Sequence, residues 1–360
     1  MHRFAFLCHP LDFHQLANLD SGVARKSPRL IRQVMAQVPP SHVRTVEITS
    51  PTGAKAIAEM ICVWLLPDQF RSLDERLVRA KLVEALEIAR GLECQLVGLG
   101  AYTKIAAFSY TDAYANFPFA VTTGNTFTSA LAVRAMQEVM GSRELLRETT
   151  EVAVVGAAGA IGNAVLRAIA PQVGKVNLAG RNLEVLEKIA GETRSYGCEV
   201  EVCLSAKHAC READLVLLAT SEPGLLIQAA DLSYGAAVID VSKPVNILPD
   251  ASRPDVAILD CAMVQTPARR MVQNHVQCFP LVEGLDSPEV FACFAESMIL
   301  ALEGRFEAYS SGRTLDIRKF DEILNLGRKH GFSTKVKVGP WKSASLPAST
   351  KLMLRSGIAS

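Results

Sequence analysis

Three glycines at the end of an apolar segment constrain the fold of this chain more than any other feature. Residues 152–164 read VAVVGAAGAIGNA, with glycines at positions 156, 159 and 162. The pattern predicts a short buried strand, a tight turn and the start of a helix. In such a unit the glycines let backbone N–H groups approach a dinucleotide pyrophosphate, and the helix N-terminus adds a partial positive charge. The predicted cofactor contacts are Gly156, Ala157, Ala158, Gly159, Ala160, Ile161 and Gly162.

A glycine triplet is weak evidence by itself, because ordinary strand-to-helix turns also contain glycines. Here the context supports dinucleotide binding, since a helix is expected over 161–170 and a second strand over 175–179. The spacing is G-x-x-G-x-x-G instead of G-x-G-x-x-G, a variant often found in NADP-dependent enzymes.

The end of the second strand indicates which nucleotide is bound. NAD sites usually place Asp or Glu about 20 residues after the glycines, whereas this chain has Gly180, Arg181 and Asn182 there. A guanidinium pairs well with a 2′-phosphate, and this segment has no carboxylate to repel the phosphate. We therefore expect NADPH as cofactor, bound in part by Arg181, Asn182 and Thr220, the last residue of a strand expected over 214–220. A solvated arginine at a strand end is the alternative interpretation.

Composition excludes several other classes. The formal net charge of the 360 residues is +1, so no overall field favours nucleic acid. Nine cysteines occur without a C-x-x-C pair or a secretory leader, which predicts free thiols in a reducing cytoplasm. Cys198, Cys203 and Cys210 are close in sequence but lack zinc-site spacing, so no metal is expected. The longest apolar runs, such as 60–66, are too short to form a transmembrane segment.

Alternating strands and helices predict an α/β protein with more than one domain. Residues 1–121 are expected to form an N-terminal α/β substrate domain. Its predicted elements include strands at 4–8 and 95–99, a hairpin over 43–66 and one long helix over 68–90.

The second domain is expected over residues 122–284, as a Rossmann-type doubly wound parallel sheet that binds NADPH. It begins with a bridging helix within 122–150, for which threonine or asparagine would be the N-cap. C-terminal helices that carry the nucleophile are expected over 285–332, starting at Ser287–Pro288. A basic flexible tail is expected over 333–360.

Cys293 is the candidate for covalent chemistry. A cysteine can take an acyl group from a thioester, and a reduced nicotinamide can then reduce the enzyme thioester to an aldehyde. Spacing alone favours a core position for Cys293, since free cysteine behaves as a small buried hydrophobe. In a helix starting at Pro288, Cys293 would lie about one and a half turns after the N-terminus, so the helix dipole would lower its pKa only weakly.

The segment FACFAE (291–296), continued by ALEG (301–304), resembles the active-site helix of the cyanobacterial-type long-chain acyl-[acyl-carrier-protein] reductases. Those enzymes make fatty aldehydes from acyl-carrier-protein thioesters with NADPH. Other blocks resemble the family in the same order, so that the similarity covers nearly the whole chain to about residue 332 and leaves out only the basic tail. These blocks are TTGNT (122–126), VVGAAGAIG (154–162), AGRN (179–182), RKHGF (328–332) and, more loosely, FLCH (6–9).

The resemblance implies reduction of long-chain acyl-carrier protein, or acyl-CoA, through an acyl thioester on Cys293 in the cytoplasm. Acyl-carrier protein would be the acyl donor, and an aldehyde-consuming enzyme and a peripheral membrane contact are left open as further partners. Thr123 and Asn125 are expected to contact substrate, and the candidates for the oxyanion donor are Thr123, Asn125 or a backbone N–H of the bridging helix. Two departures from the family, Phe127 in place of a frequent histidine and DVSKP (240–244) in place of a glycine-rich turn, are expected near the nicotinamide or acyl channel.

Two other functions stay open from the sequence. A dehydrogenase of the shikimate-dehydrogenase type would reduce a small polar substrate directly, with a lysine and an aspartate such as Lys243 and Asp240. A non-catalytic NADP-binding module would need Cys293 to be inert. The basic segment RKSPRLIR (25–32) is either a solvated helix start or a docking site for an acidic carrier protein.

Overall fold

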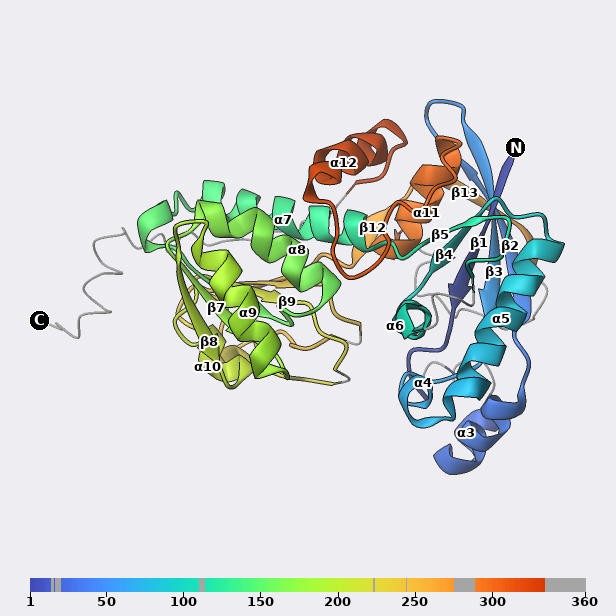
Figure 1. Ribbon diagram of the computed structural model, residues 1–360, viewed down its shortest axis with the longest axis horizontal. Coiled ribbons are helices and arrows are strands. Elements are labelled where there is room, and N and C mark those ends of the chain that lie inside the picture. Colours follow the sequence, from blue (N-terminus) through green and yellow to red (C-terminus); the bar gives the residue numbers. More distant parts are fainter. Residues whose placement is uncertain are drawn as a thin grey trace, which may run out of the picture.

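The computed structural model describes residues 1–13, 16, 21–109, 114–222, 224–243, 245–274 and 289–333. These residues fold around two six-stranded sheets. The sheets lie toward opposite ends of the molecule, and the long helix α7 (Asn125–Ser142) runs between them (Figure 1). In this part of the chain no helix combines the length and the apolar character needed to span a bilayer.

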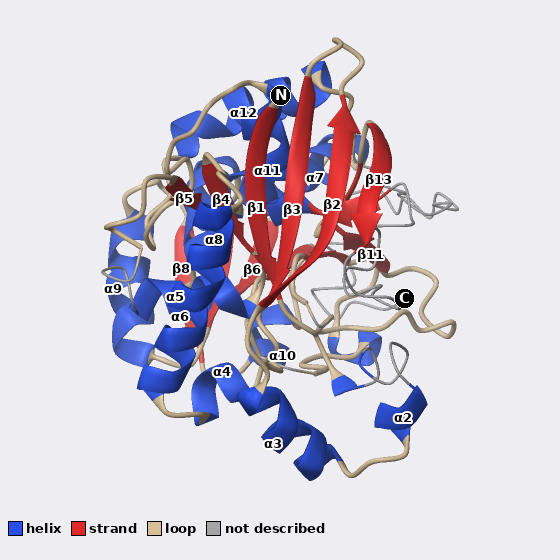
Figure 2. Cartoon of the chain, turned by 90° about the vertical axis from the view of Figure 1, so that its right-hand side faces the viewer, coloured by secondary structure: helices blue, strands red, loops and turns tan. Residues whose placement is uncertain are grey.

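The N-terminal sheet has the strand order β13-β2-β3-β1-β4-β5 (Figure 2). Five strands, β13, β3, β1, β4 and β5, run in the same direction, and β2 runs antiparallel to its two neighbours β13 and β3. The predicted hairpin is confirmed as β2 and β3. Most residues of β1, β3 and β4 are apolar and buried, as expected for strands that are covered on both faces. The strands are β1 (His2–Cys8), β2 (Ser41–Thr49), β3 (Lys55–Cys62), β4 (Leu96–Leu99), β5 (Ala120–Thr122) and β13 (Ala268–Asn274).

Helices cover both faces of this sheet. One face packs on α5 (Glu75–Gly91) and α6 (Tyr102–Ser109), and the other packs on α11 (Ala292–Leu302). The single helix expected over 68–90 is two helices, α4 (Gln69–Ser72) and α5. The break occurs because Leu73 is extended and the Asp74 side chain caps α5 by accepting from the Arg76 N–H. The other helices on this side are α2 (Ser21–Ala24) and α3 (Pro28–Gln37).

The second sheet confirms the predicted doubly wound α/β fold. Its order is β11-β10-β9-β6-β7-β8, and every neighbouring pair is parallel. The first strand of this sheet along the chain, β6, therefore sits at the point where the direction of winding reverses, which is where α/β sheets bind ligands. The strands are β6 (Glu151–Val155), β7 (Lys175–Ala179), β8 (Glu199–Cys203), β9 (Leu215–Leu218), β10 (Ala237–Asp240) and β11 (Ala257–Asp260). The helices are α8 (Ala160–Ile169), α9 (Leu183–Arg194) and α10 (Ala206–Cys210), with short 3-10 turns η2 (Arg147–Thr149), η3 (Ala170–Gln172) and η4 (Ala229–Asp231).

The chain after β11 differs from the expected course. Strand β13 lies within 122–284, yet it pairs with β2 of the N-terminal sheet. The helix expected from 286 starts only at Ala292, because residues before it form β14 (Glu289–Phe291), which pairs with β12 (Met263–Gln265). The expected start at Ser287–Pro288 and the tail from 334 lie outside the described residues. The chain then forms η5 (Ile317–Lys319) and α12 (Phe320–Lys329).

Candidate active site

A cavity of about 930 Å³ lies where the carboxyl ends of both sheets meet. Segments that follow β1, β4, β6, β7, β9 and β10 all contribute to its walls, together with the first turns of α7 and α11. Most of the predicted site residues line it: Asn125, Gly156, Ala158, Gly159, Ala160, Ile161, Arg181, Asn182, Thr220 and Cys293. Ala157 and Gly162 are buried beneath the turn, and Thr123 is buried beside the cavity.

The glycine turn has the shape of a phosphate cradle. Gly156 has φ +92°, and a Cβ there would lie 2.3 Å from the Ala219 carbonyl oxygen. A Cβ on Gly162 would lie 2.3 Å from the Gly156 carbonyl oxygen, so this glycine lets α8 pack closely on the turn. Gly159 is the N-cap of α8 and has no side chain over the helix end. The arrangement leaves open backbone at a helix N-terminus, which suits a pyrophosphate.

Arg181 lies at the far end of this cradle, next to the carboxylate of Glu222. Its side chain is 77% exposed, and its guanidinium is 3.5 Å from a carboxylate oxygen of Glu222, which also lines the cavity. Glu222 comes from the loop after β9, about 40 residues later in the chain, so the local sequence around Arg181 contains no carboxylate that would predict this contact. Asn182 caps α9 by accepting from the Val185 N–H at 3.1 Å. The Thr220 hydroxyl donates to Asn246 at 2.9 Å.

Cys293 is the second residue of α11, directly after the N-cap Phe291 and Ala292. The expected position of Cys293 in its helix is therefore wrong, and the residue lies in the first turn, where the influence of a helix N-terminus is concentrated. Burial raises the pKa of the Cys293 thiol above its ordinary value, while the Lys104 cation and the backbone N–H groups of Ala101 and Phe294 act to lower it. The thiol thus lies half-buried at a helix end, with hydrogen-bond donors around the sulfur.

One of these donors belongs to a strained residue. Ala101 follows β4 and has φ +43°, in the left-handed region that alanine rarely adopts. Such strain costs about 1–3 kcal/mol and persists where the surroundings hold it in place. The next N–H, of Tyr102, is fixed on His9, and the Tyr102 hydroxyl donates to the Ser221 carbonyl across the cavity. The loop after β4 is therefore held from both sides.

The N-terminus of α7 packs directly against Cys293. A Cβ on Gly124 would lie 2.3 Å from the Cα of Cys293, and Gly124 has φ +71°. The predicted threonine or asparagine cap is wrong, since Gly124 is the N-cap and offers no side chain. Glu296 supplies the missing cap from α11, because its carboxylate accepts from the Phe127 N–H at 2.8 Å.

Glu296 is buried among polar partners. Its carboxylate also accepts from the Thr122 hydroxyl at 2.7 Å and contacts the Ser310 hydroxyl at 2.9 Å. Burial raises its pKa, and the hydrogen bonds from Thr122 and Phe127 oppose this rise. Glu296 therefore joins β5, α7 and the segment after α11 within one turn of the Cys293 sulfur. Its charge in an otherwise apolar helix was the available sequence signal.

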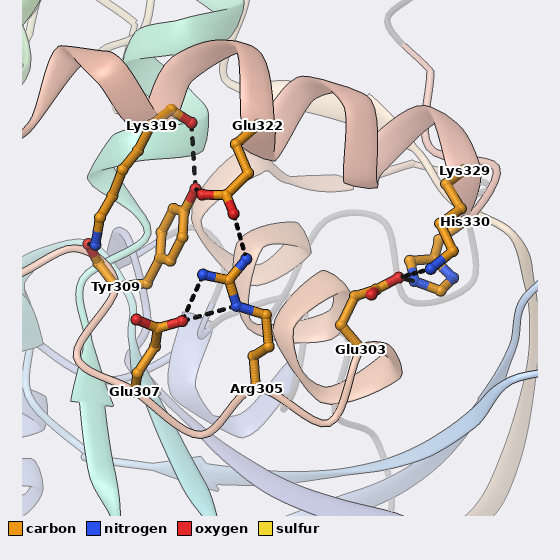
Figure 3. Close-up of polar contacts among 8 residues, drawn as sticks. All are labelled: Glu303, Arg305, Glu307, Tyr309, Lys319, Glu322, Lys329 and His330. Atoms are coloured by element: carbon orange, nitrogen blue, oxygen red, sulfur yellow. Dashed lines mark hydrogen bonds and ion pairs between the residues drawn. The ribbon is translucent and has the colours of Figure 1, made fainter.

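A polar network anchors the segment that carries Ser310 (Figure 3). Arg305 donates to Glu307 and Glu322, each at 2.7 Å, and the Tyr309 hydroxyl donates to Glu322 at 2.8 Å. Ser310, the next residue, is thereby held against Glu296. Contacts between the segment after α11 and α12 therefore hold Ser310 in place, and Ser310 in turn holds Glu296, one turn of α11 from Cys293.

The C-terminal end of α11 is fixed by a second group of charges in the same view (Figure 3). Lys329 and the ring Nε2 of His330 both contact Glu303 at 2.5 Å, and the other ring nitrogen of His330 lies 2.8 Å from the Ser50 hydroxyl. Burial raises the pKa of Glu303, but Lys329 and His330 outweigh it, so the pKa stays below its ordinary value.

His9 lines the cavity but is not available as a base. Its Nδ1–H donates to the Pro10 carbonyl at 2.8 Å, and its Nε2 accepts the Tyr102 N–H at 3.0 Å. Burial lowers the pKa of His9 to about 4. His9 is therefore a neutral structural residue at neutral pH.

The expected positions of the two family departures are corrected in part. Phe127 is 2% exposed and packs against Gly327 of α12, away from the cavity lining. Val241 and Lys243 do line the cavity. Lys243 pairs with Asp260 at 2.6 Å, while Asp240 accepts from the N–H groups of Ser242 and Asn246. Lys243 and Asp240 therefore do not form the lysine–aspartate pair considered above.

A cluster outside the cavity was not visible in the sequence spacing. Glu201, Cys203 and His208 each bring one potential metal ligand atom within 4.8 Å of the others. Lys175 donates to Glu201 at 2.8 Å, so an ammonium group already neutralises the carboxylate.

Comparison with protein families gives one match. The model of the shikimate / quinate 5-dehydrogenase family matches residues 141–261, the part of the chain that holds β6 to β11. Together with the parallel strand order, this shows an NAD(P)-binding domain of the oxidoreductase type.

Two curated proteins are similar over most of the chain. The aminotransferase PigE of a Serratia species is 28% identical over 290 residues, which are 79% of this chain and 33% of that protein. The chain thus spans about a third of the length of this relative. The long-chain acyl-[acyl-carrier-protein] reductase of Synechococcus elongatus is 27% identical over 324 residues, which are 82% of this chain and 88% of that protein.

Solved structures are similar at low identity. 5-Ketofructose reductase of a Gluconobacter species is 14% identical with a TM-score of 0.39, over 90% of this chain and 98% of that chain. Quinate dehydrogenase of Corynebacterium glutamicum, in complex with NAD, is 17% identical with a TM-score of 0.33, over 68% of this chain and 80% of that chain.

Proposed function

We propose that this chain reduces an acyl thioester to an aldehyde with NADPH, through an acyl thioester on Cys293. The observation that carries the proposal is that Cys293, in the first turn of α11, lines the same cavity as the glycine turn. A nucleophile and a dinucleotide cradle in one cavity are what a two-stage reduction needs.

The lining near Cys293 supports an acyl substrate. On the side of the N-terminal sheet the walls are largely apolar, formed by Phe6, Cys8, Leu11, Ile105 and Phe291. Burial of apolar surface would hold a hydrocarbon chain there at about 25 cal/mol per Å². A long acyl chain and an acyl-carrier-protein donor are proposed from the similarity to the Synechococcus elongatus reductase.

Different residues of the cavity would have different roles in the proposed reaction. The helix end and the N–H groups of Ala101 and Phe294 favour the thiolate of Cys293, which attacks the thioester carbonyl carbon. Asn125 lines the cavity next to Gly124, in the position proposed for a substrate contact, while the buried Thr123 hydroxyl does not reach the lining. When bound, the reduced nicotinamide supplies the hydride that converts the acyl group to an aldehyde.

NADPH is proposed over NADH because Arg181 lines the nucleotide side of the cavity. The guanidinium would pair with a 2′-phosphate. Glu222 beside it opposes this preference through its charge, so the balance of the two side chains sets the selectivity.

Direct reduction of a polar substrate, as in shikimate dehydrogenases, is the alternative raised by the family match. The cavity lining includes two lysines. The Lys104 ammonium donates to the Asn125 amide oxygen at 2.9 Å, whereas Lys243 pairs with Asp260 at 2.6 Å, which is the contact that favours this alternative. Such a reaction would not need Cys293.

The test is product formation from acyl-carrier protein and acyl-CoA with NADPH, measured as aldehyde by gas chromatography. Cys293→Ala should abolish aldehyde formation, and Cys8→Ala, which alters another cysteine of the same cavity, should retain it. Aldehyde formation by Cys293→Ala would overturn the covalent route, and the absence of any aldehyde from the unaltered protein would overturn the proposed activity.

A further inference from the structure

Lys104 is a cation in the cavity that the sequence analysis did not single out. It belongs to α6, the short helix that Figure 1 shows on the side of the N-terminal sheet that faces the nucleotide-binding sheet. Its side chain lines the cavity together with Cys293. The ammonium donates to Asn125 Oδ1 at 2.9 Å. Lys104 follows the carboxyl end of a parallel strand, which is where such sheets place functional side chains.

The anchor of Lys104 places it beside the cysteine. Asn125 is the first residue of α7, and the preceding residue, Gly124, packs on the backbone of Cys293. The N-termini of α7 and α11 and the Lys104 ammonium therefore all lie close to Cys293.

Among the described residues the Lys104 ammonium has a neutral amide as its hydrogen-bond partner and forms no direct ion pair, although the charge of Glu296 acts on it at longer range. Two other cations of the cavity lining are paired with carboxylates, since Arg181 contacts Glu222 and Lys243 contacts Asp260. Glu296 is the carboxylate nearest to Cys293 along α11. Its oxygens are hydrogen-bonded to Thr122, Phe127 and Ser310, and not to Lys104. A half-buried ammonium held by a neutral amide favours an anion in the space in front of it.

Building on the proposed function, we infer that Lys104 is a further catalytic residue, the cation that stabilises negative charge on the Cys293 sulfur and on the reacting carbonyl oxygen. The electrostatic effect of Lys104 on the thiol, which lowers the Cys293 pKa, agrees with this role.

The two steps of the reaction place negative charge at the same point. In the first, the Cys293 thiolate forms a bond to the thioester carbon and the carbonyl electron pair moves to oxygen. The oxyanion then collapses, the bond to the carrier sulfur breaks, and that sulfur leaves as a thiolate that takes a proton from solvent. In the second, a hydride from the reduced nicotinamide adds to the carbonyl carbon, the oxyanion re-forms, and its collapse releases aldehyde and the Cys293 thiolate. Lys104 stabilises the Cys293 thiolate and the oxyanion of each step, and it is not consumed.

The first experiment measures the thiol without any acyl substrate. Alkylation of Cys293 by iodoacetamide is followed against pH by peptide mass spectrometry in the unaltered protein, Lys104→Met and Lys104→Arg. The other charged and titratable groups around the cavity are the same in all three proteins, so they do not cause a difference in midpoint. His9 is neutral with a pKa of about 4, and the remaining groups are Glu296, Arg181, Glu222, Lys243 and Arg313. Loss of the cation should raise the pH midpoint by about one unit or more, and arginine should restore it. An unchanged midpoint in Lys104→Met would overturn the inference.

A second variant tests the same inference if Lys104→Met fails to fold. Asn125→Asp keeps the shape of the side chain but gives Lys104 a carboxylate partner, so the midpoint should rise here too. NADPH binding, followed by fluorescence, should be retained in both variants. With acyl thioester, Lys104→Met should lower kcat about 100-fold, as expected for loss of an oxyanion donor, and Lys104→Arg should recover much of it. If the unaltered protein is never acylated, the proposed function fails, while the alkylation midpoints still report on Lys104 and the thiol.

Discussion

Gly124→Ala is the substitution for which the structure allows the effect to be worked out most fully. Alanine at φ +71° is in the left-handed region, which costs about 1 kcal/mol. Its Cβ would also lie 2.3, 2.4 and 2.5 Å from the Cα, Cβ and carbonyl oxygen of Cys293, so backbone must move. Overpacking of this kind costs about 1–3 kcal/mol. The expected total is about 2–4 kcal/mol of unfolding free energy, with slower alkylation of Cys293 because α7 and α11 are pushed apart.

Gly235→Ala is the matched control. Gly235 has φ +72°, and a Cβ on it would meet no other atom within 4 Å, so only the conformational cost of about 1 kcal/mol applies. Both variants are compared by urea denaturation followed by circular dichroism, and by the rate of iodoacetamide alkylation at Cys293. If Gly124→Ala is no less stable than Gly235→Ala and its cysteine reacts at the same rate, the described packing of α7 on Cys293 is wrong.

Three further predictions concern cofactor choice, acid stability and docking. Arg181→Asp should shift the ratio of kcat/KM values from NADPH toward NADH and Glu222→Gln should shift it toward NADPH; ratios that do not move in opposite directions would exclude this pair as the selectivity determinant. Because the pKa of Glu303 is lowered in the fold, its ionised form stabilises the protein above its ordinary pKa of 4.5 and this contribution is lost as the pH falls. Glu303→Gln should therefore melt at a lower temperature than the unaltered protein at neutral pH and approach it in acid, whereas a gap independent of pH would contradict the assignment. Charge reversal at Arg25, exposed in the turn before α3, and at Arg29, exposed in its first turn, should raise KM for acyl-carrier protein and spare acyl-CoA; equal effects on both substrates would argue against docking there.

The nucleotide-binding sheet could be predicted from sequence because its signals are local. Apolar strands of four or five residues alternate with short helices, and the glycine turn lies between β6 and α8. Each element is specified by residues within it, so periodicity was enough to place it. The strand β13 could not be placed in this way, because its partner β2 is more than 200 residues earlier in the chain.

The candidate site depends on contacts that no local pattern reveals. The start of α11 follows the pairing of β14 with β12, so that Cys293 lies in the first turn of the helix and not about one and a half turns after its start, as expected. The cap of α7 comes from Glu296, 169 residues away from the N–H that it accepts. Lys104 and Glu222 likewise reach the cavity from loops and helices that the glycine motif does not include. The sequence therefore predicted that Cys293 and the glycine turn belong to one site, and the structure places both at the same cavity, while the charges around them depend on tertiary contacts.

Trapping of the enzyme-bound acyl group tests the covalent role of Cys293 most directly. The protein is incubated with acyl-carrier protein and no NADPH, digested and examined by mass spectrometry, and NADPH is then added to a parallel sample. One acyl group should be found on the peptide that contains Cys293, and the added cofactor should release it as aldehyde. An acyl group on any other residue, or one on Cys293 that NADPH leaves in place, would contradict the proposed reaction.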